Sequence, residues 1–98
     1  MKLNEPRQVI PTTPYKKDLK SIKKQKKDLE LLKEILNKLR VDEPLPQNNL
    51  DHNLKGSYHT CRECHITPDW LLIYEKIPGK LVLHRTGSHA KLFEKNRK

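Results

Sequence analysis

Long hydrophobic runs, methionine and cysteine are scarce in this 98-residue sequence, and each shortage excludes a class of protein. No apolar run approaches the roughly 20 residues that a transmembrane helix needs, and the N-terminus MKLNEPRQVI lacks the apolar core of a secretory signal. We therefore expect one small, soluble, cytoplasmic domain with no membrane partner. Because reducing thiols keep cysteine pairs open in the cytosol, a structural disulfide between the two cysteines is not expected.

Both cysteines stand in the segment CRECH, residues 61–65, which has the CxxCH spacing of c-type haem attachment. Haem is disfavoured because it is attached outside the cytosol and because Met1 is the single methionine for a distal position. A zinc site of the two thiols and His65 could recruit His52 or His59, but no second CxxC or HxxxH pair is present. We favour two small residues of a β-strand and expect neither metal nor cofactor.

Acidic residues are too few to balance the basic ones. Lys and Arg number 21 against 12 Asp and Glu, a formal net charge of +9. Residues 15–40 alone carry ten Lys or Arg and four Asp or Glu, a local difference of +6. This excess indicates a polyanionic partner, with nucleic acid ahead of an anionic membrane, although a solvated helix face is the plainer alternative.

Periodic apolar residues predict a helical first half. Residues 1–13 are expected to form an edge strand or an extended arm, and residues 14–41 two basic helices, with Thr13 as the first N-cap and Pro14 in the first turn. Because residues 15–43 contain no Gly or Pro, one long helix stays possible, but a hairpin with Asp28 as the second cap suits a compact domain better. The helical spacing is carried by Tyr15, Leu19, Ile22, Leu32, Ile35, Leu36 and Leu39.

The second half predicts a sheet. Residues 42–57 are rich in Pro, Asn and Gly and are expected to form a long loop, followed by the sheet and site over 58–93 and a basic tail, 94–98. Short β-type runs at 61–67, 70–76 and 80–86, separated by two turns, predict an antiparallel meander with WLLIY as its central strand. The predicted fold class is α+β, with two N-terminal helices packed on a twisted, mostly antiparallel sheet.

All five histidines fall in this second half, together with Asp69 and Arg85. Because a meander brings alternate strand ends together, several of these side chains could meet at one edge of the sheet. Imidazoles and a carboxylate can move protons, and a guanidinium can hold a phosphate. These are the parts of a metal-free ribonuclease, although from the residues alone a basic nucleic-acid-binding module is the plainer interpretation.

Three sequence blocks decide between these two functions: DHNLKG at 51–56, RECHITPDW at 62–70 and RTGSHAKLF at 85–93. Residues 50–93 resemble the YafQ branch of the RelE/ParE toxin superfamily, bacterial mRNA interferases of type II toxin–antitoxin modules. The resemblance implies a microbial-RNase-like fold, ribosome-dependent cleavage of A-site mRNA, translation inhibition and growth arrest. It also implies a cognate acidic antitoxin and operator DNA contacted only through the toxin–antitoxin complex. The alternative within the superfamily is a non-catalytic gyrase poison.

The same resemblance places the functional residues. It makes His89 the candidate general acid and Arg85 the phosphate clamp, and it leaves the general base open among three residues, with Asp69 or His52 preferred and His65 orienting. Phe93 and Lys55 are the further substrate-binding candidates. Trp70 is interpreted mainly as a core residue, and His59 and His84 match no functional position.

Overall fold

The computed structural model describes residues 5–93, which form one five-stranded sheet with helices on both sides. The strand order is β1-β5-β4-β3-β2, so β4 is central, as the apolar run WLLIY predicts. β1 pairs with β5 in parallel, and all other neighbours are antiparallel. The strands are β1 (Gln8–Pro11), β2 (His52–Asn53), β3 (Arg62–Thr67), β4 (Trp70–Ile77) and β5 (Lys80–Gly87).

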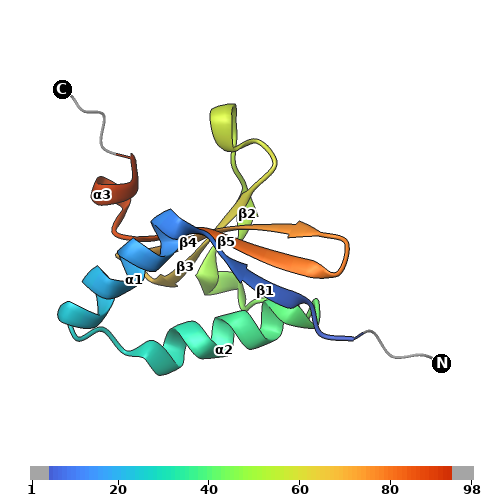
Figure 1. Ribbon diagram of the computed structural model, residues 1–98, viewed down its shortest axis with the longest axis horizontal. Helices are drawn as coiled ribbons and strands as arrows, with labels where there is room; N and C mark the ends of the chain where they lie inside the picture. Colours follow the sequence, from blue (N-terminus) through green and yellow to red (C-terminus); the bar gives the residue numbers. More distant parts are fainter. Residues whose placement is uncertain (1–4, 94–98) are drawn as a thin grey trace.

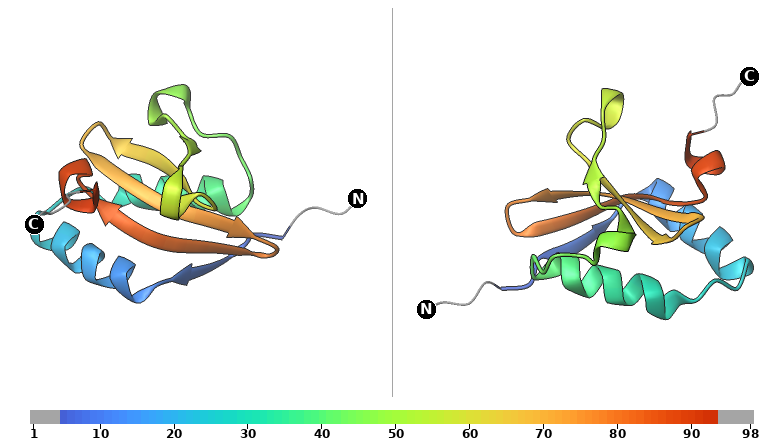
Figure 2. Two further views of the ribbon diagram at one scale, coloured as in Figure 1. Left: turned by 90° about the horizontal axis from the view of Figure 1, so that it is seen from above. Right: turned by 180° about the vertical axis from the view of Figure 1, so that it is seen from behind.

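Helices α1 (Thr13–Lys24) and α2 (Leu29–Arg40) lie together on one side of the sheet (Figure 1). The β2–β3 connection, with the 3₁₀ turn η2 (Gly56–Tyr58), and the short helix α3 (His89–Phe93) rise from the opposite side (Figures 1 and 2). A second 3₁₀ turn, η1 (Gln47–Asn49), follows α2. The predicted α+β class is confirmed.

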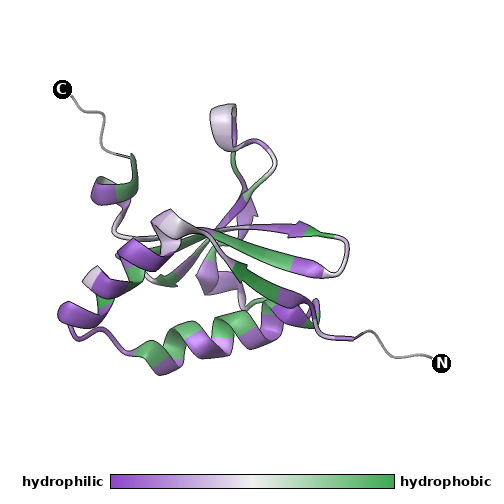
Figure 3. Ribbon diagram, in the orientation of Figure 1, coloured by the Kyte–Doolittle hydropathy of each residue, from purple (hydrophilic) through white to green (hydrophobic). Residues whose placement is uncertain are grey.

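The main core fills the space between α1, α2 and the sheet. Each helix turns its apolar stripe toward the strands and its charged side outward (Figure 3). The helices are separate, as predicted, because the side chain of Asp28 accepts a hydrogen bond from the Glu30 amide at 3.0 Å and starts α2. The core is formed by Tyr15, Ile22, Leu32, Ile35, Leu39, Cys64, Ile66, Trp70, Leu72, Tyr74, Leu81 and Leu83.

Three local predictions are wrong. The N-cap of α1 is Thr12, not Thr13, because Thr12 is still extended beside Leu83 of β5 and its hydroxyl accepts from the Tyr15 amide. The loop predicted for 42–57 contains β2, which at two residues is too short for alternation to reveal. The last segment, expected to be strand and site, ends in α3, whose five residues show no helical period. The tail 94–98 lies outside the described residues.

Among residues 5–93, no helix is long and apolar enough to cross a membrane.

Candidate functional site

The strand register brings distant polar residues into one row across four strands. His52 of β2 pairs with Glu63 of β3, Glu63 pairs with Ile73 of β4, and Ile73 pairs with Arg85 of β5. Directly opposed residues point to the same face of a sheet. Neighbouring strands are about 4.8 Å apart, so the backbones at Glu63 and Arg85 are separated by roughly 10 Å, which a nucleotide's sugar and phosphate can span.

A second row lies beside the first and leads to α3. His65 pairs with Leu71, and Leu71 pairs with Gly87, two residues before His89 opens the helix. The floor between the polar ends is apolar, because Leu71 and Ile73 are fully buried in a small cluster with Cys61 and Leu92. We call the face that carries both rows the open face, since α1 and α2 cover the other one.

Glu63 is the centre of the β2–β3 side of the site. Its side chain is buried, yet Oε1 lies 3.3 Å from His52 Nε2 and 3.8 Å from His65 Nε2. The other nitrogen of His52, Nδ1, is 2.6 Å from the carbonyl oxygen of Leu50. When the His52 ring is protonated, both nitrogens therefore donate to an acceptor, one of them the carboxylate.

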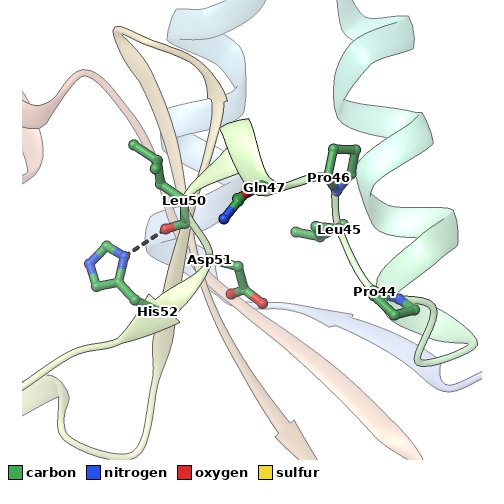
Figure 4. A pocket seen from close by; sticks show the side chains of 7 residues that line it. All are labelled: Pro44, Leu45, Pro46, Gln47, Leu50, Asp51 and His52. Carbon is green, nitrogen blue, oxygen red and sulfur yellow. Dashed lines mark hydrogen bonds between the residues drawn. The ribbon is translucent and has the colours of Figure 1, made fainter.

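A pocket of about 480 Å³ adjoins His52 on the segment that leads into β2 (Figure 4). Pro44, Leu45 and Pro46 form one wall, and the imidazole of His52 lies at the opposite end, bonded to Leu50 (Figure 4). The Asp51 carboxylate in this pocket accepts hydrogen bonds from the Tyr74 hydroxyl at 2.5 Å and from Arg62 Nε at 3.2 Å. These bonds hold the chain just before His52 in place.

Arg85 is anchored from below by a residue of α1. Its Nε and Nη2 donate to the Asp18 carboxylate at 2.6 and 3.0 Å, and the Thr86 amide donates to the same group at 3.1 Å. The hydrogen bond to Asp18 raises the pKa of Arg85, with a smaller contribution from the Tyr58 hydroxyl. The Nε–Nη2 edge of the guanidinium is therefore engaged with Asp18.

The β5 end of the site carries the aromatic groups. The ring of His89 packs on Phe93 with 4.8 Å between centroids, and Phe93 meets Tyr58 edge to face at 6.4 Å. His89 itself is exposed, so its imidazole is free to reach a ligand. The structure thus brings Arg85, His89 and Phe93 together around Tyr58.

Asp69 has no bonded partner among the described residues. It is exposed in the tight turn between β3 and β4, and its side chain makes no hydrogen bond or ion pair with residues 5–93. Lys55 is exposed in the β2–β3 connection. Trp70 is buried, and its indole Nε1 donates to Thr86 Oγ1 at 2.9 Å, which fits the predicted core role.

The two thiols of CRECH do not belong to one shared metal or haem site. Cys64 belongs to the main core under the helices, whereas Cys61 belongs to the apolar cluster of the open face. Burial raises the pKa of Cys64 to about 12, so its thiol stays protonated. Two thiols on opposite faces of one sheet cannot hold the same ion or the same haem.

Sequence reasoning missed two carboxylates of the site. Glu63 stands two residues before His65, and this alternation in a strand puts both on one face, a signal that was available. Asp18 gave no signal, because it sits among lysines of α1 and reaches Arg85 across 67 residues of sequence. Its burial at 5% exposure is what separates it from the solvated charges around it.

Comparison with known proteins agrees with the sequence resemblance. The family model described as bacterial toxin of type II toxin–antitoxin system, YafQ, matches residues 7–94. The mRNA interferase toxin YafQ of Escherichia coli K12 is 42% identical over 80 residues, covering 81% of this chain and 87% of the relative. The chain therefore belongs to the YafQ family of type II toxin–antitoxin toxins.

Solved structures show the same fold. A copper-bound mutant toxin from Helicobacter pylori superposes with a TM-score of 0.85 at 37% identity, over 89% of this chain and 99% of that one. The toxin of the E. coli DinJ–YafQ toxin–antitoxin complex superposes with a TM-score of 0.83 at 38% identity, over 92% and 100%.

Proposed function

We propose that this toxin is an mRNA endoribonuclease that cleaves A-site mRNA on the ribosome and so inhibits translation and growth. The observation that carries the proposal is the row from His52 and Glu63 to Arg85, with His89 and Phe93 at its β5 end. In this proposal the proton acceptor and the proton donor act from opposite sides of the apolar floor, which is about one nucleotide wide. The curated relative from E. coli, named an mRNA interferase, supports the same activity.

The base in this proposal is the His52–Glu63 pair. His52 Nε2 and Glu63 Oε1 lie 3.3 Å apart, and this pair takes the proton of the ribose 2′-OH. The 2′ oxygen then attacks the adjacent phosphorus. His65, with its Nε2 at 3.8 Å from the same carboxylate, orients it. Asp69, one of the two preferred bases by resemblance, is less well placed because its carboxylate touches neither histidine.

Arg85 and His89 serve the other half of the step. The guanidinium stabilises the charge that develops on the non-bridging oxygens, while Asp18 holds it in position. As the bond from phosphorus to the 5′ oxygen breaks, His89 gives that oxygen its proton. The products are a 2′,3′-cyclic phosphate and a free 5′-hydroxyl. In this proposal Phe93, whose ring packs at a tilt on His89, contacts a base, and Lys55 contacts a phosphate.

The test is cleavage of mRNA on programmed ribosomes by the purified chain. We expect His89→Gln to slow single-turnover cleavage by about 10²–10⁴, the usual contribution of a positioned acid. His59→Gln, an exposed histidine bonded to Gly56 outside both rows, is the matched control and should cut at the parent rate. If His89→Gln remains fully toxic and no RNA ends are found, the chain fits the non-catalytic, gyrase-poison alternative.

A double-mutant cycle tests the base. If His52 and Glu63 act as one unit, the rate loss of the double variant His52→Gln/Glu63→Gln should match that of the worse single variant. Independent losses that multiply would contradict a shared role. Asp69→Asn in parallel should leave the rate within about threefold of the parent, and a larger loss would restore Asp69 as the base.

We also propose a cognate acidic antitoxin as the protein partner. An anionic, flexible chain is complementary to a +9 domain and would cover its charges. The E. coli relative is found in complex with DinJ, which supports the proposal. Operator DNA would be bound only through that complex. Binding of the protein encoded beside this gene should weaken steeply as salt rises, and a salt-independent affinity would contradict the electrostatic account.

A further inference from the structure

A second cluster of chemically active side chains lies on the open face, outside the two rows. The ligand atoms of Cys61, Glu75 and His84 all lie within 4.8 Å of one another. The closest pair, His84 Nε2 and Glu75 Oε1, is 3.0 Å apart. Cys61 is 3% exposed, whereas the side chains of His84 and Glu75 are 29% and 25% exposed. The cluster is therefore buried at Cys61 and reachable from solvent at His84 and Glu75.

His84 lies at a bulge in β5, on the same face of the sheet as Glu75. Ile73 pairs with Arg85 and Tyr74 pairs with Leu83, so His84 is an extra residue without a partner on β4. Because His84 follows Leu83, which points into the main core, alternation turns His84 to the open face, diagonal to Glu75, which pairs with Val82. The bulge then lets Arg85 lie on the open face as well, instead of alternating back toward the helices.

The third side chain comes from the end of the β2–β3 connection. The carbonyl of Cys61 accepts from the Leu54 amide at 3.1 Å, and its own amide donates to the Tyr58 carbonyl at 2.8 Å. These two bonds fix the Cys61 backbone within the β2–β3 connection. The site is therefore assembled from three separate segments, as metal sites in folded domains usually are.

We propose that Cys61, Glu75 and His84 bind a zinc ion, with water in the fourth position. A thiolate, an imidazole and a carboxylate are the ligand types of Zn²⁺, and harder ions such as Mg²⁺ or Ca²⁺ do not choose thiols. Zinc bond lengths of about 2.0–2.3 Å imply tetrahedral ligand separations of roughly 3.3–3.8 Å. The Glu75–His84 pair is already close to this range, and rotation of the Cys61 thiol closes the remainder.

A bound ion would connect the β2–β3 connection to β4 and β5. Tyr58, three residues before Cys61, lies beside Arg85 and Phe93, so the ion would stabilise the aromatic end of the site without touching it. The proposal stands independently of the ribonuclease proposal, because none of its three ligands belongs to either row.

The test is titration of the purified full chain with Co²⁺, a spectroscopic substitute for Zn²⁺. We expect one equivalent to bind with a near-ultraviolet thiolate-to-cobalt band and visible tetrahedral bands, both removed by added Zn²⁺. Cys61→Ser and His84→Gln should weaken binding by at least about tenfold, and Zn²⁺ should raise the melting temperature of the parent but not of these variants.

Matched controls separate this site from its neighbours. Cys64→Ala keeps Cys61 as the sole thiol, and His52→Gln removes a histidine of the row; both should retain the thiolate band. Absence of the band in the parent, or its persistence in Cys61→Ser, would overturn the proposal. So would cobalt binding that is lost in His52→Gln and kept in His84→Gln.

Discussion

The two faces of the sheet differ in what covers them. The helix face buries twelve residues in one continuous core beneath α1 and α2, whereas the open face buries four, Cys61, Leu71, Ile73 and Leu92, under a connection and one turn of helix. Titratable side chains follow the opposite distribution: the candidate catalytic histidines, Glu63 and the Cys61–Glu75–His84 cluster all belong to the open face.

This contrast shows how a small domain separates stability from chemistry. Apolar area buried on one face supplies most of the driving force for folding, so the other face can hold partly solvated ionisable groups. An ion pair links the two regions, because Asp18 of α1 holds Arg85. Variants of the two faces should therefore divide into those that alter the free energy of unfolding and those that alter activity, with Asp18 affecting both.

The largest effect on stability is expected from two neighbouring leucines. Leu72 and Leu71 are both 0% exposed, but Leu72 packs under the helices and Leu71 in the smaller cluster. We expect Leu72→Ala to lower the free energy of unfolding by about 3–5 kcal/mol and Leu71→Ala by about 2–3 kcal/mol, because the smaller cluster can collapse around the space. Urea denaturation of both variants measures the difference.

Activity should show the reverse order for this pair. At a temperature where both variants are folded, Leu71→Ala should slow RNA cleavage more, since Leu71 forms the floor between the rows. Equal losses of stability and of cleavage in the two variants would remove the distinction between the faces.

An intermediate effect is expected at the contact between the faces. Asp18→Asn leaves Arg85 without a charged partner, and we expect the free energy of unfolding to fall by about 2–3 kcal/mol. The loss should be small for a buried ion pair because Arg85 is partly exposed. RNA cleavage should fall as well. Asp28→Asn makes the same charge change at the exposed cap of α2, where Asn is an equally good cap, and should cost almost nothing. An Asp18→Asn variant as stable and as active as the parent would contradict the role of Asp18 in holding Arg85.

The smallest effect is expected at an exposed ion pair remote from the site. Hydrogen bonds from Lys76 at 2.8 Å and from Arg7 at 3.1 Å lower the pKa of Asp42 below its ordinary value of 3.8. A lowered folded pKa stabilises the fold above the ordinary value, and this contribution disappears as pH falls through the folded value. Because Asp42 is exposed, Asp42→Asn should cost only about 0.2–1 kcal/mol at pH 7.

Thermal melts of parent and Asp42→Asn at several pH values test this. The difference should shrink as pH falls below 3.8 and disappear once pH is below the lowered folded pKa, and a difference that grows in acid would contradict the assignment.

Sequence patterns predicted the elements well where period and length were sufficient. The stripe from Leu32 to Leu39 marks α2, and WLLIY marks the central strand, because burial dictates both patterns locally. The two-residue β2, the five-residue α3 and the shift of the cap to Thr12 were missed, since each depends on a neighbour distant in sequence.

The site residues predicted from the sequence stay a prediction. His52, His65, Arg85, His89 and Phe93 lie on the open face and Asp69 in the exposed turn between β3 and β4, but the buried carboxylates Glu63 and Asp18 were overlooked. A carboxylate's identity is visible in the sequence, whereas its burial and its partner are not.

The sequence by itself determined two amphipathic helices, a meander with an apolar centre and a strong positive charge, because hydrophobic period and net charge are properties of the chain alone. The tertiary structure decided which ionisable groups meet. Strand register, with a bulge in β5, put His52, Glu63 and Arg85 in one row, the pairing of β4 with β5 brought His84 to Glu75, and helix docking gave Arg85 its partner. Shifting a strand by a single residue would move its side chains to the other face, and no local pattern of these letters records such a shift.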